Sequence, residues 1–281
     1  MTRGGVRSWE RLVLASGLPR LEARVLLEAA SARRREWLIA HGDEAADADA
    51  AERFEALAQR RRAGEPIAYL VGTREFAGRR FVTTPAVLIP RPETELLVAF
   101  VLRHAGRAAS VIDLGTGSGA IAVTLACERN DLRIVATDRS EDALAIARRN
   151  AQRLCPEALD RGRLDLRSGD WWRAVRTDER FDVVVSNPPY VAEDDEHLRR
   201  GDLRHEPRTA LAAGVEGLDA LRTIVEGAPA HVAPGGRIAL EHGHRQGAAV
   251  RALLASRGWR DVVTHRDEAG SERVTSARPF L

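Results

Sequence analysis

Apolar residues recur at helical spacing over the first quarter of the chain. They are spaced by three or four residues within successive groups: Trp9, Leu12 and Val13; Leu21, Val25 and Leu26; Phe54 and Leu57. Such spacing places side chains on one face of a helix. Gly17-Leu18-Pro19 and Gly64-Glu65-Pro66 interrupt the pattern and separate the helices. Residues 1–72 are therefore predicted to form a small helical bundle.

The pattern changes after Gly72, where short extended runs replace the helical spacing. The runs are Glu75-Phe76, Arg80-Phe81-Val82 and Val87-Leu88-Ile89, punctuated by Gly78, Pro85, Pro90 and Pro92. Glycine and proline favour turns and loops because of their unusual backbone freedom and restriction. Residues 73–92 are therefore predicted to form a hairpin and linker, and the segment 90–95 is expected to cap a helix beside the pocket described below.

From Ser110 onward, strand-like runs alternate with helical segments. The expected strands lie at 111–114, 134–137, 164–166, 183–186, 237–240 and 262–264 and near Val274; the expected helices lie at 120–128, 141–153, 218–232 and 247–256. This alternation is typical of a doubly wound, mostly parallel α/β sheet. Residues 93–281 are therefore predicted to form one catalytic domain of the α/β class.

The charge composition removes several kinds of chemistry. Of 281 residues, 43 are basic and 41 acidic, for a formal net charge of +2, and every basic residue is an arginine. Without lysine, the chain can be neither a Schiff-base enzyme nor a Walker-type nucleotide hydrolase. The runs Arg33-Arg34-Arg35 and Arg60-Arg61-Arg62 are interpreted as solvated helix faces. The alternative is a patch that meets ribosomal RNA or an acidic partner.

Targeting, redox and metal chemistry leave few traces in the sequence. Charges interrupt the N-terminal residues, so we expect neither a signal peptide nor a membrane span, and a cytoplasmic location. Cys127 and Cys155 lack metal-ligand spacing and are expected to be reduced thiols. His242 and His244 have no obvious third ligand nearby. No metal site is therefore predicted.

A glycine-rich loop predicts a cofactor site. Gly115-Thr116-Gly117-Ser118-Gly119 follows the first strand of the sheet pattern and opens a helix. Glycines allow a ligand to approach the backbone, and a helix N-terminus offers free N–H groups. Asp138 ends the second strand about 20 residues later, where a carboxylate can accept both ribose hydroxyls. The pair indicates an adenosine cofactor; the alternative is an ordinary strand–helix turn with Asp138 capping the next helix.

Asp170 and Trp171 follow the third strand. In such a sheet this position lies over an adenine ring, so Asp170 could bind the exocyclic amine and Trp171 could pack on the ring. The other interpretation is that Trp171 and its neighbour Trp172 are ordinary packing aromatics.

The most informative stretch is the tetrapeptide Asn187-Pro188-Pro189-Tyr190, which directly follows an apolar strand. The prolines remove two N–H donors and leave acceptors at the carboxyl edge of the sheet, where ligands bind. The Asn187 amide oxygen and the Pro188 carbonyl can together hold both hydrogens of a planar NH₂ group. Tyr190 would offer an aromatic face to a flat group that gains positive charge. The tetrapeptide predicts alkylation of an amide or amine nitrogen.

Taken together, the motifs resemble the HemK/PrmC family, the peptide chain release factor glutamine methyltransferases. The resemblance rests on GEPIAYLVGTREF (64–76), IPRPETE (89–95), IDLGTGSGAIA (112–122), SNPPYV (186–191), HEP (205–207), EHGHRQG (241–247) and GSERV (270–274). It covers nearly the whole chain. It implies a class I methyltransferase fold, similar to a Rossmann fold, with an antiparallel last strand.

The resemblance also implies roles for individual residues. The loop 115–119, Asp138, Trp171 and Asn187 would hold S-adenosyl-L-methionine, which leaves as S-adenosyl-L-homocysteine, and Asp170 is expected to join this site. The tetrapeptide 187–190 would hold the glutamine of the Gly-Gly-Gln motif of class 1 peptide chain release factors 1 and 2. The N-terminal helical domain would dock the rest of that factor. We expect a monomer.

Three alternatives remain at the level of sequence. A DNA or RNA amino-methyltransferase also handles planar NH₂ groups, but such an enzyme usually needs a basic track along phosphates, and a net charge of +2 argues against stable nucleic-acid binding. A glutamine methyltransferase of a ribosomal protein is a closer alternative. A nucleotide-binding regulatory or oxidoreductase domain would leave the tetrapeptide at 187–190 unexplained.

Overall fold

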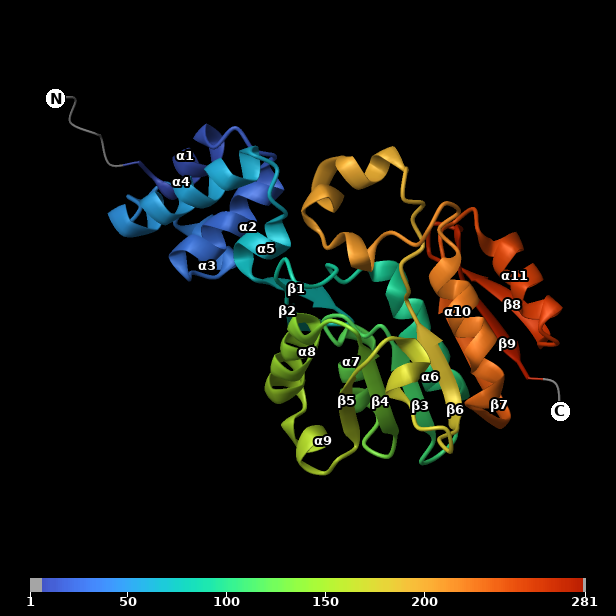
Figure 1. The fold of residues 1–281 in the computed structure, drawn as a ribbon. Coiled ribbons are helices and arrows are strands. Elements are labelled where there is room, and N and C mark those ends of the chain that lie inside the picture. The colour runs from blue at the N-terminus through green and yellow to red at the C-terminus, as the bar shows by residue number, and fades with distance from the viewer. Residues whose placement is uncertain (1–6, 280–281) are drawn as a thin grey trace. The chain divides into compact units, whose positions relative to one another are not determined.

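The computed structural model describes residues 7–279. Contacts divide the chain into two compact units (Figure 1). One unit runs up to Thr73 and includes the segment Gly201–His205, and the other comprises Arg74–Arg200 and the chain from Glu206 onward. Within residues 7–279, no helix is long and apolar enough to cross a membrane.

The first unit is a bundle of short helices. They are α1 (Trp9–Ala15), α2 (Arg20–Ser31), α3 (Arg35–Ala40), α4 (Ala48–Arg62) and α5 (Ile67–Val71), joined by the 3-10 helix η4 (Gly201–His205). Trp9, Leu26 and Phe54 are buried in its core, as their spacing predicts. Leu21, however, is 63% exposed. The core face of α2 comprises Leu26 and Leu27 together with Ala23 and Ala30, and the pattern of larger apolar residues does not reveal the two alanines.

The arginine run at the end of α4 is not a solvated face at Arg61, so that interpretation is wrong there. The Arg61 guanidinium donates to both carboxylate oxygens of Glu22, at 2.8 and 3.0 Å, and to Asp202 at 2.8 Å. Its side chain is only 18% exposed. Hydrogen bonds to Glu22 raise the pKa of Arg61 further above its ordinary value. The contact with Asp202 ties the segment 201–205 to the bundle.

The predicted hairpin is present in the second unit. Strands β1 (Thr73–Phe76) and β2 (Arg79–Val82) form a two-stranded sheet. The run Val87–Ile89, which was expected to be extended and to belong to the hairpin and linker, lies in an irregular loop. Asn150 fixes the end of the hairpin: its buried amide accepts from the Val82 N–H at 2.7 Å and donates to the Val82 carbonyl at 3.1 Å.

A seven-stranded sheet forms the body of the second unit, in the order β5-β4-β3-β6-β7-β9-β8 (Figure 1). Its strands are β3 (Ser110–Leu114), β4 (Arg133–Asp138), β5 (Leu164–Ser168), β6 (Phe181–Ser186), β7 (Val232–Glu241), β8 (Arg260–Arg266) and β9 (Glu272–Arg278). The last strand, β9, runs antiparallel to both neighbours, whereas the pairs from β5 to β7 are parallel. The expected class I methyltransferase topology is confirmed.

Helices cover both faces of this sheet. They are α6 (Glu95–His104), α7 (Ala120–Glu128), α8 (Glu141–Leu154), α9 (Pro156–Asp160), α10 (Asp219–Gly227) and α11 (Gly247–Ser256). Alternate residues of β6 divide between two cores: Val183 and Val185 pack with α6 and α7, and Val184 packs with α10 and α11. The helix expected over 218–232 stops at Gly227, and Val232 already begins β7.

Short 3-10 helices complete the unit: η1 (Pro92–Thr94), η2 (Trp171–Ala174), η3 (Glu196–Arg199), η5 (Arg208–Ala210) and η6 (Ala228–Ala230). The apolar periodicity predicts none of these. They matter because η1, η2 and η5 contribute residues to the cavity described below.

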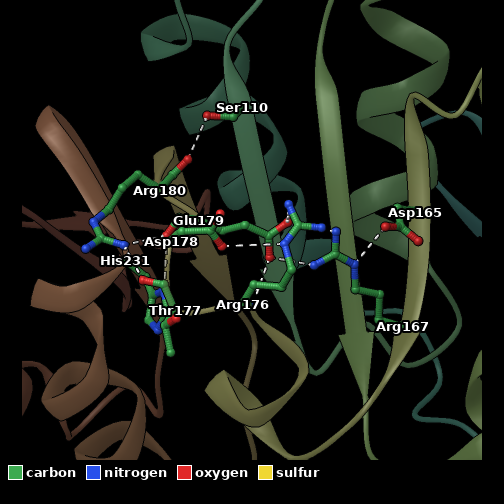
Figure 2. A network of polar contacts seen from close by, with 9 residues as sticks. All are labelled: Ser110, Asp165, Arg167, Arg176, Thr177, Asp178, Glu179, Arg180 and His231. Atoms are coloured by element: carbon green, nitrogen blue, oxygen red, sulfur yellow. Dashed lines mark hydrogen bonds and ion pairs between the residues drawn. The ribbon is translucent and has the colours of Figure 1, made fainter.

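A polar network around Glu179 anchors the turn that leads from η2 into β6 (Figure 2). The Glu179 carboxylate accepts two hydrogen bonds from the Arg167 guanidinium, at 2.7 and 3.0 Å, and one from the Arg176 N–H at 2.9 Å. The bond to Arg167 is the main reason that the pKa of Glu179 falls to about 2. Because Arg167 belongs to β5 and Glu179 precedes β6, the network holds the η2 connection across the sheet.

The register of the parallel strands determines where the site forms. Leu114 at the end of β3 pairs with Thr137 of β4 and with Ser186 of β6. The glycine loop, Asp138 and Asn187 follow these three residues directly in the chain. They therefore lie together at one edge of the sheet.

Candidate active site

A cavity of about 480 Å³ lies at this edge of the second unit. Such a volume suits a small-molecule ligand. Its walls come from the linker after β2, the glycine loop, the ends of β4 and β5, the tetrapeptide after β6, and the segment around α10. Principal lining residues are Val87, Arg91, Thr94, Gly115, Gly117, Asp138, Asp170, Trp171, Asn187, Pro189, Thr209 and Thr223.

The glycine loop is shaped by hydrogen bonds to the neighbouring strand. The N–H groups of Gly115 and Thr116 both donate to the Thr137 carbonyl, at 2.9 and 2.8 Å. Gly115, Gly117 and Gly119 have φ of +74°, +56° and +81°, a region that glycine occupies without strain. Among the predicted loop residues, Gly115, Thr116, Gly117 and Ser118 line the cavity, whereas Gly119 starts helix α7 behind it.

Two of these glycines also allow close packing. A Cβ atom at Gly119 would lie 3.0 Å from Val123 and 3.2 Å from Ala147, so the residue lets α7 approach α8. A Cβ atom at Gly115 would lie 3.2 Å from the Trp171 ring. The loop, the indole and the two helices therefore depend on one another for their positions.

Asp138 braces the loop and faces the cavity. One carboxylate oxygen accepts from the Gly117 N–H and the other from the Ser140 N–H, both at 2.9 Å. Each oxygen retains a second lone pair for a ligand hydroxyl. Helix α8 is capped by Ser140, whose hydroxyl accepts from the Ala143 N–H, so Asp138 is not the capping residue. Burial raises the pKa of Asp138.

Asp170 and Trp171 both line the cavity. Trp171 has a φ of +49°, a strained conformation for a bulky residue that costs on the order of 1–3 kcal/mol. This conformation sets its ring against Gly115. The neighbouring Trp172 packs differently: its indole N–H donates to the Ile224 carbonyl at 3.0 Å, and its ring stacks on His231. The two tryptophans thus have separate surroundings.

The tetrapeptide after β6 reaches the cavity through its first and third residues. Asn187 and Pro189 line the cavity, and Pro188 is buried. The Asn187 amide nitrogen donates to the Thr94 hydroxyl at 2.9 Å. The Tyr190 hydroxyl donates to the Glu241 carboxylate at 3.3 Å, and Tyr190 is not among the lining residues. Burial raises the pKa of this tyrosine, so its hydroxyl stays protonated at neutral pH.

Arg91, Thr94 and Glu206 are polar residues at this site for which the motif chemistry predicts no role. Arg91 forms an ion pair with Glu206, whose other oxygen accepts from the Ile89 N–H at 2.9 Å. The Glu206 side chain is fully buried. The sequence did point to these residues indirectly. Arg91 and Thr94 lie in the segment 89–95 and Glu206 lies in the segment 205–207, and both segments contribute to the family resemblance. Residue chemistry alone does not reveal that the two segments meet.

The arrangement suits positioning chemistry. The glycine loop, the Asp138 carboxylate and the Trp171 indole line the cavity, and together they fit an adenosine group. Asn187 lines the same cavity. Asp113 lies behind the loop, fully buried, and accepts from the Thr116 hydroxyl at 2.7 Å. Its burial raises its pKa to about 7.

Comparisons with known proteins give consistent results. Residues 7–72 match the family model of the PrmC N-terminal domain, and residues 92–203 match the model of the methyltransferase small domain. The release factor glutamine methyltransferase of Burkholderia pseudomallei is 54% identical over 269 residues, covering 95% of this chain and 94% of that protein. The protein of the same name from Bordetella pertussis is 50% identical, covering 94% and 96%.

The fold also has solved relatives. The 16S rRNA N2 G1207 methyltransferase of T. thermophilus, solved in complex with AdoMet and guanosine, superposes with a TM-score of 0.53. The match covers 74% of this chain and 50% of that one, at 19% identity. At this level of identity the likeness concerns the fold alone.

The buried Asp113 generates a pH-dependent prediction. Folding raises the pKa of Asp113, so the charged form costs more free energy in the folded protein than in the unfolded one. The free energy of unfolding is therefore highest below about pH 4 and falls as the pH rises through about 7. Asp113→Asn keeps an acceptor for Thr116 and removes the charge. In urea unfolding without ligand, we expect the free energy of unfolding of the variant to rise relative to that of the unaltered protein, by up to about 4 kcal/mol between pH 4 and pH 8.

The control is Asp178→Asn, which changes a well-exposed carboxylate. Its free energy of unfolding, relative to the unaltered protein, should stay nearly constant over the same pH range. A difference for Asp113→Asn that is equally flat would contradict the assigned environment of Asp113.

Proposed function

Because the chain belongs to the family of release factor glutamine methyltransferases, we propose that it methylates the side-chain amide nitrogen of a glutamine. The substrate is the glutamine of the Gly-Gly-Gln motif of class 1 release factors 1 and 2, and the methyl donor is S-adenosyl-L-methionine. The observation that carries the proposal is the placement of Asn187 in the same cavity as Gly117 and Asp138. The Asn187 side chain is suited to hold a planar amide, and Gly117 and Asp138 are suited to hold an adenosine.

The residues present fit this cofactor. Gly117 has a positive φ angle and open space where a side chain would stand, so a ligand can approach the backbone there. Asp138 has free lone pairs at the cavity wall for ribose hydroxyls, and Trp171 offers an aromatic face. We infer that Asp170 binds the adenine amine and that Thr116 and Ser118 complete the loop contacts.

The chemistry asks mainly for alignment. The cofactor supplies an activated methyl group as a sulfonium, whereas a carboxamide nitrogen is a poor nucleophile because its lone pair is delocalised. Holding the nitrogen in line with the methyl group can supply up to about 7–11 kcal/mol of the barrier. The Asn187 oxygen and the Pro188 carbonyl accept the two NH₂ hydrogens and stabilise the nitrogen as it becomes cationic. Its excess proton then leaves to water, so no strong base is required.

The first test is methyl transfer itself. The protein is incubated with methyl-labelled cofactor and a release factor, and the labelled peptide is mapped by mass spectrometry. We expect the label on the glutamine of the Gly-Gly-Gln motif and none on a release factor whose glutamine is replaced by asparagine. Parallel incubations contain DNA, RNA and large-subunit ribosomal proteins. Label only in one of these would refute the proposed substrate.

The second prediction concerns Asn187→Ala. Loss of the amide acceptor should lower kcat by at least about 10²-fold, since such a contact acts mainly in the transition state. Cofactor affinity should stay within about tenfold, because the glycine loop and Asp138 are unchanged. Asn130→Ala, at an exposed loop position, is the matched control and should behave like the unaltered protein. Normal turnover by Asn187→Ala would exclude this mechanism.

The third prediction concerns Asp138→Ala. The ribose hydroxyls lose a charged acceptor and the loop loses its brace at the Gly117 N–H. Because each such hydrogen bond contributes about 1.5–3 kcal/mol, cofactor affinity measured by calorimetry should fall by roughly 100-fold. Asp178→Ala serves as the exposed control. If Asp138→Ala binds the cofactor as tightly as this control, Asp138 does not contact the cofactor.

A further inference from the structure

Thr94 occupies a helix-capping position but does not cap the helix. It is the residue before α6, where a threonine hydroxyl ordinarily accepts from a backbone N–H of the first turn. In this protein the Thr94 side chain makes no capping hydrogen bond. Its hydroxyl instead accepts from the Asn187 amide nitrogen at 2.9 Å, and the residue is only 4% exposed. The Thr94 hydroxyl therefore serves Asn187 in the cavity wall and not the N-terminus of α6.

Glu241 is a second buried residue, close to Thr94. It ends strand β7 and is 1% exposed. One of its oxygens accepts from the Tyr190 hydroxyl, and the other, Oε2, has no hydrogen-bond partner within 3.5 Å among residues 7–279. The Thr94 hydroxyl interacts with the same carboxyl and lowers its pKa, against the larger effect of burial, which raises it to about 7. An ionised carboxylate can only accept, so it attracts the Thr94 hydroxyl hydrogen.

The unpartnered Oε2 of Glu241 gives this arrangement a direction, because it is a buried acceptor close to the buried Thr94 hydroxyl. A hydroxyl has one hydrogen, and once that hydrogen turns to Glu241 only lone pairs remain toward Asn187. Lone pairs are satisfied by the NH₂ end of the Asn187 amide and repel its oxygen. We propose that Thr94 and Glu241 are positioning residues that hold the Asn187 amide with its oxygen toward the cavity, and thereby select an NH₂-bearing substrate. This rests on the proposed methyl transfer to glutamine.

The direction also determines specificity. With its oxygen toward the cavity, Asn187 accepts from the NH₂ of glutamine and repels the carboxylate of glutamate. With the amide reversed, its NH₂ would face the cavity and favour a carboxylate or the carbonyl end of glutamine. The second arrangement points the substrate nitrogen away from the methyl donor. Loss of the Thr94 hydroxyl should therefore both slow the reaction and improve the binding of glutamate in place of glutamine.

The decisive variants are Thr94→Val, which keeps the shape and removes the hydroxyl, and Thr94→Ser, which restores the hydroxyl. Kinetics are measured at about pH 8.5, where Glu241 is ionised. A release factor with glutamate at the Gly-Gly-Gln glutamine serves as competitive inhibitor. We expect Thr94→Val to lower kcat by about 10–100-fold, to lower the ratio of inhibition constant to KM by at least about fivefold, and to leave cofactor affinity within about threefold. Thr94→Ser should lie within about threefold of the unaltered protein in all three quantities.

Glu241→Gln provides an independent variant that removes a buried charge and so should fold. A glutamine there can donate to Thr94 and free the hydroxyl hydrogen to meet the Asn187 oxygen. We expect kcat and the ratio of inhibition constant to KM to fall as in Thr94→Val, but by smaller factors. Unchanged kinetics in both Thr94→Val and Glu241→Gln, or equal defects in Thr94→Val and Thr94→Ser, would overturn the proposal.

A readout without turnover separates this proposal from the function on which it rests. NMR of the cofactor-bound protein reports solvent exchange of the Asn187 side-chain NH₂ hydrogens. Exchange should be slow in the unaltered protein and Thr94→Ser, and faster in Thr94→Val and Glu241→Gln. Equal exchange in all four proteins would overturn the positioning role whether or not methyl transfer occurs. An inactive protein with the expected exchange pattern would instead refute only the proposed function.

Discussion

The parallel register of β3, β4 and β6 is the constraint on which the site depends. Because Leu114 pairs with both Thr137 and Ser186, three strands end at one level and their following residues share one edge. The glycine loop bonds to the Thr137 carbonyl, Asp138 braces the loop, and Asn187 lines the same cavity. A shift of one residue in either pairing would turn these side chains to the opposite face of the sheet.

Behind the cavity, the protein maintains two buried carboxyls at a cost in stability. Asp113 supports the loop through Thr116, and Glu241 lies beside Thr94 and Tyr190. Each has one buried oxygen without a hydrogen-bond partner within 3.5 Å in the described part of the chain. Buried polar atoms without hydrogen-bond partners destabilise a fold. Here both lie directly behind residues that face the cavity, which is where preorganisation is useful.

Much of this arrangement could be predicted from the sequence because it rests on local patterns. The alternation of strands and helices predicts the sheet, and the motifs at 115–119 and 187–190 belong to segments that directly follow strands. Leu21 shows where the pattern fails: it is exposed, and Ala23 and Ala30 share the core face of α2 with Leu26 and Leu27. The position of Thr94 beside Asn187 depends on a contact between residues 93 positions apart, and no spacing in the sequence encodes it. The same holds for Arg61 and Asp202.

One cavity is proposed to orient a planar amide between the Asn187 oxygen and the methyl donor. A crystal structure of the protein with S-adenosyl-L-homocysteine and a release factor tests this proposal most directly. We expect the glutamine nitrogen within hydrogen-bond distance of the Asn187 amide oxygen and the Pro188 carbonyl, and the cofactor ribose hydroxyls on Asp138. A glutamine bound outside this cavity, or with its carbonyl oxygen against Asn187, would contradict this role of the cavity.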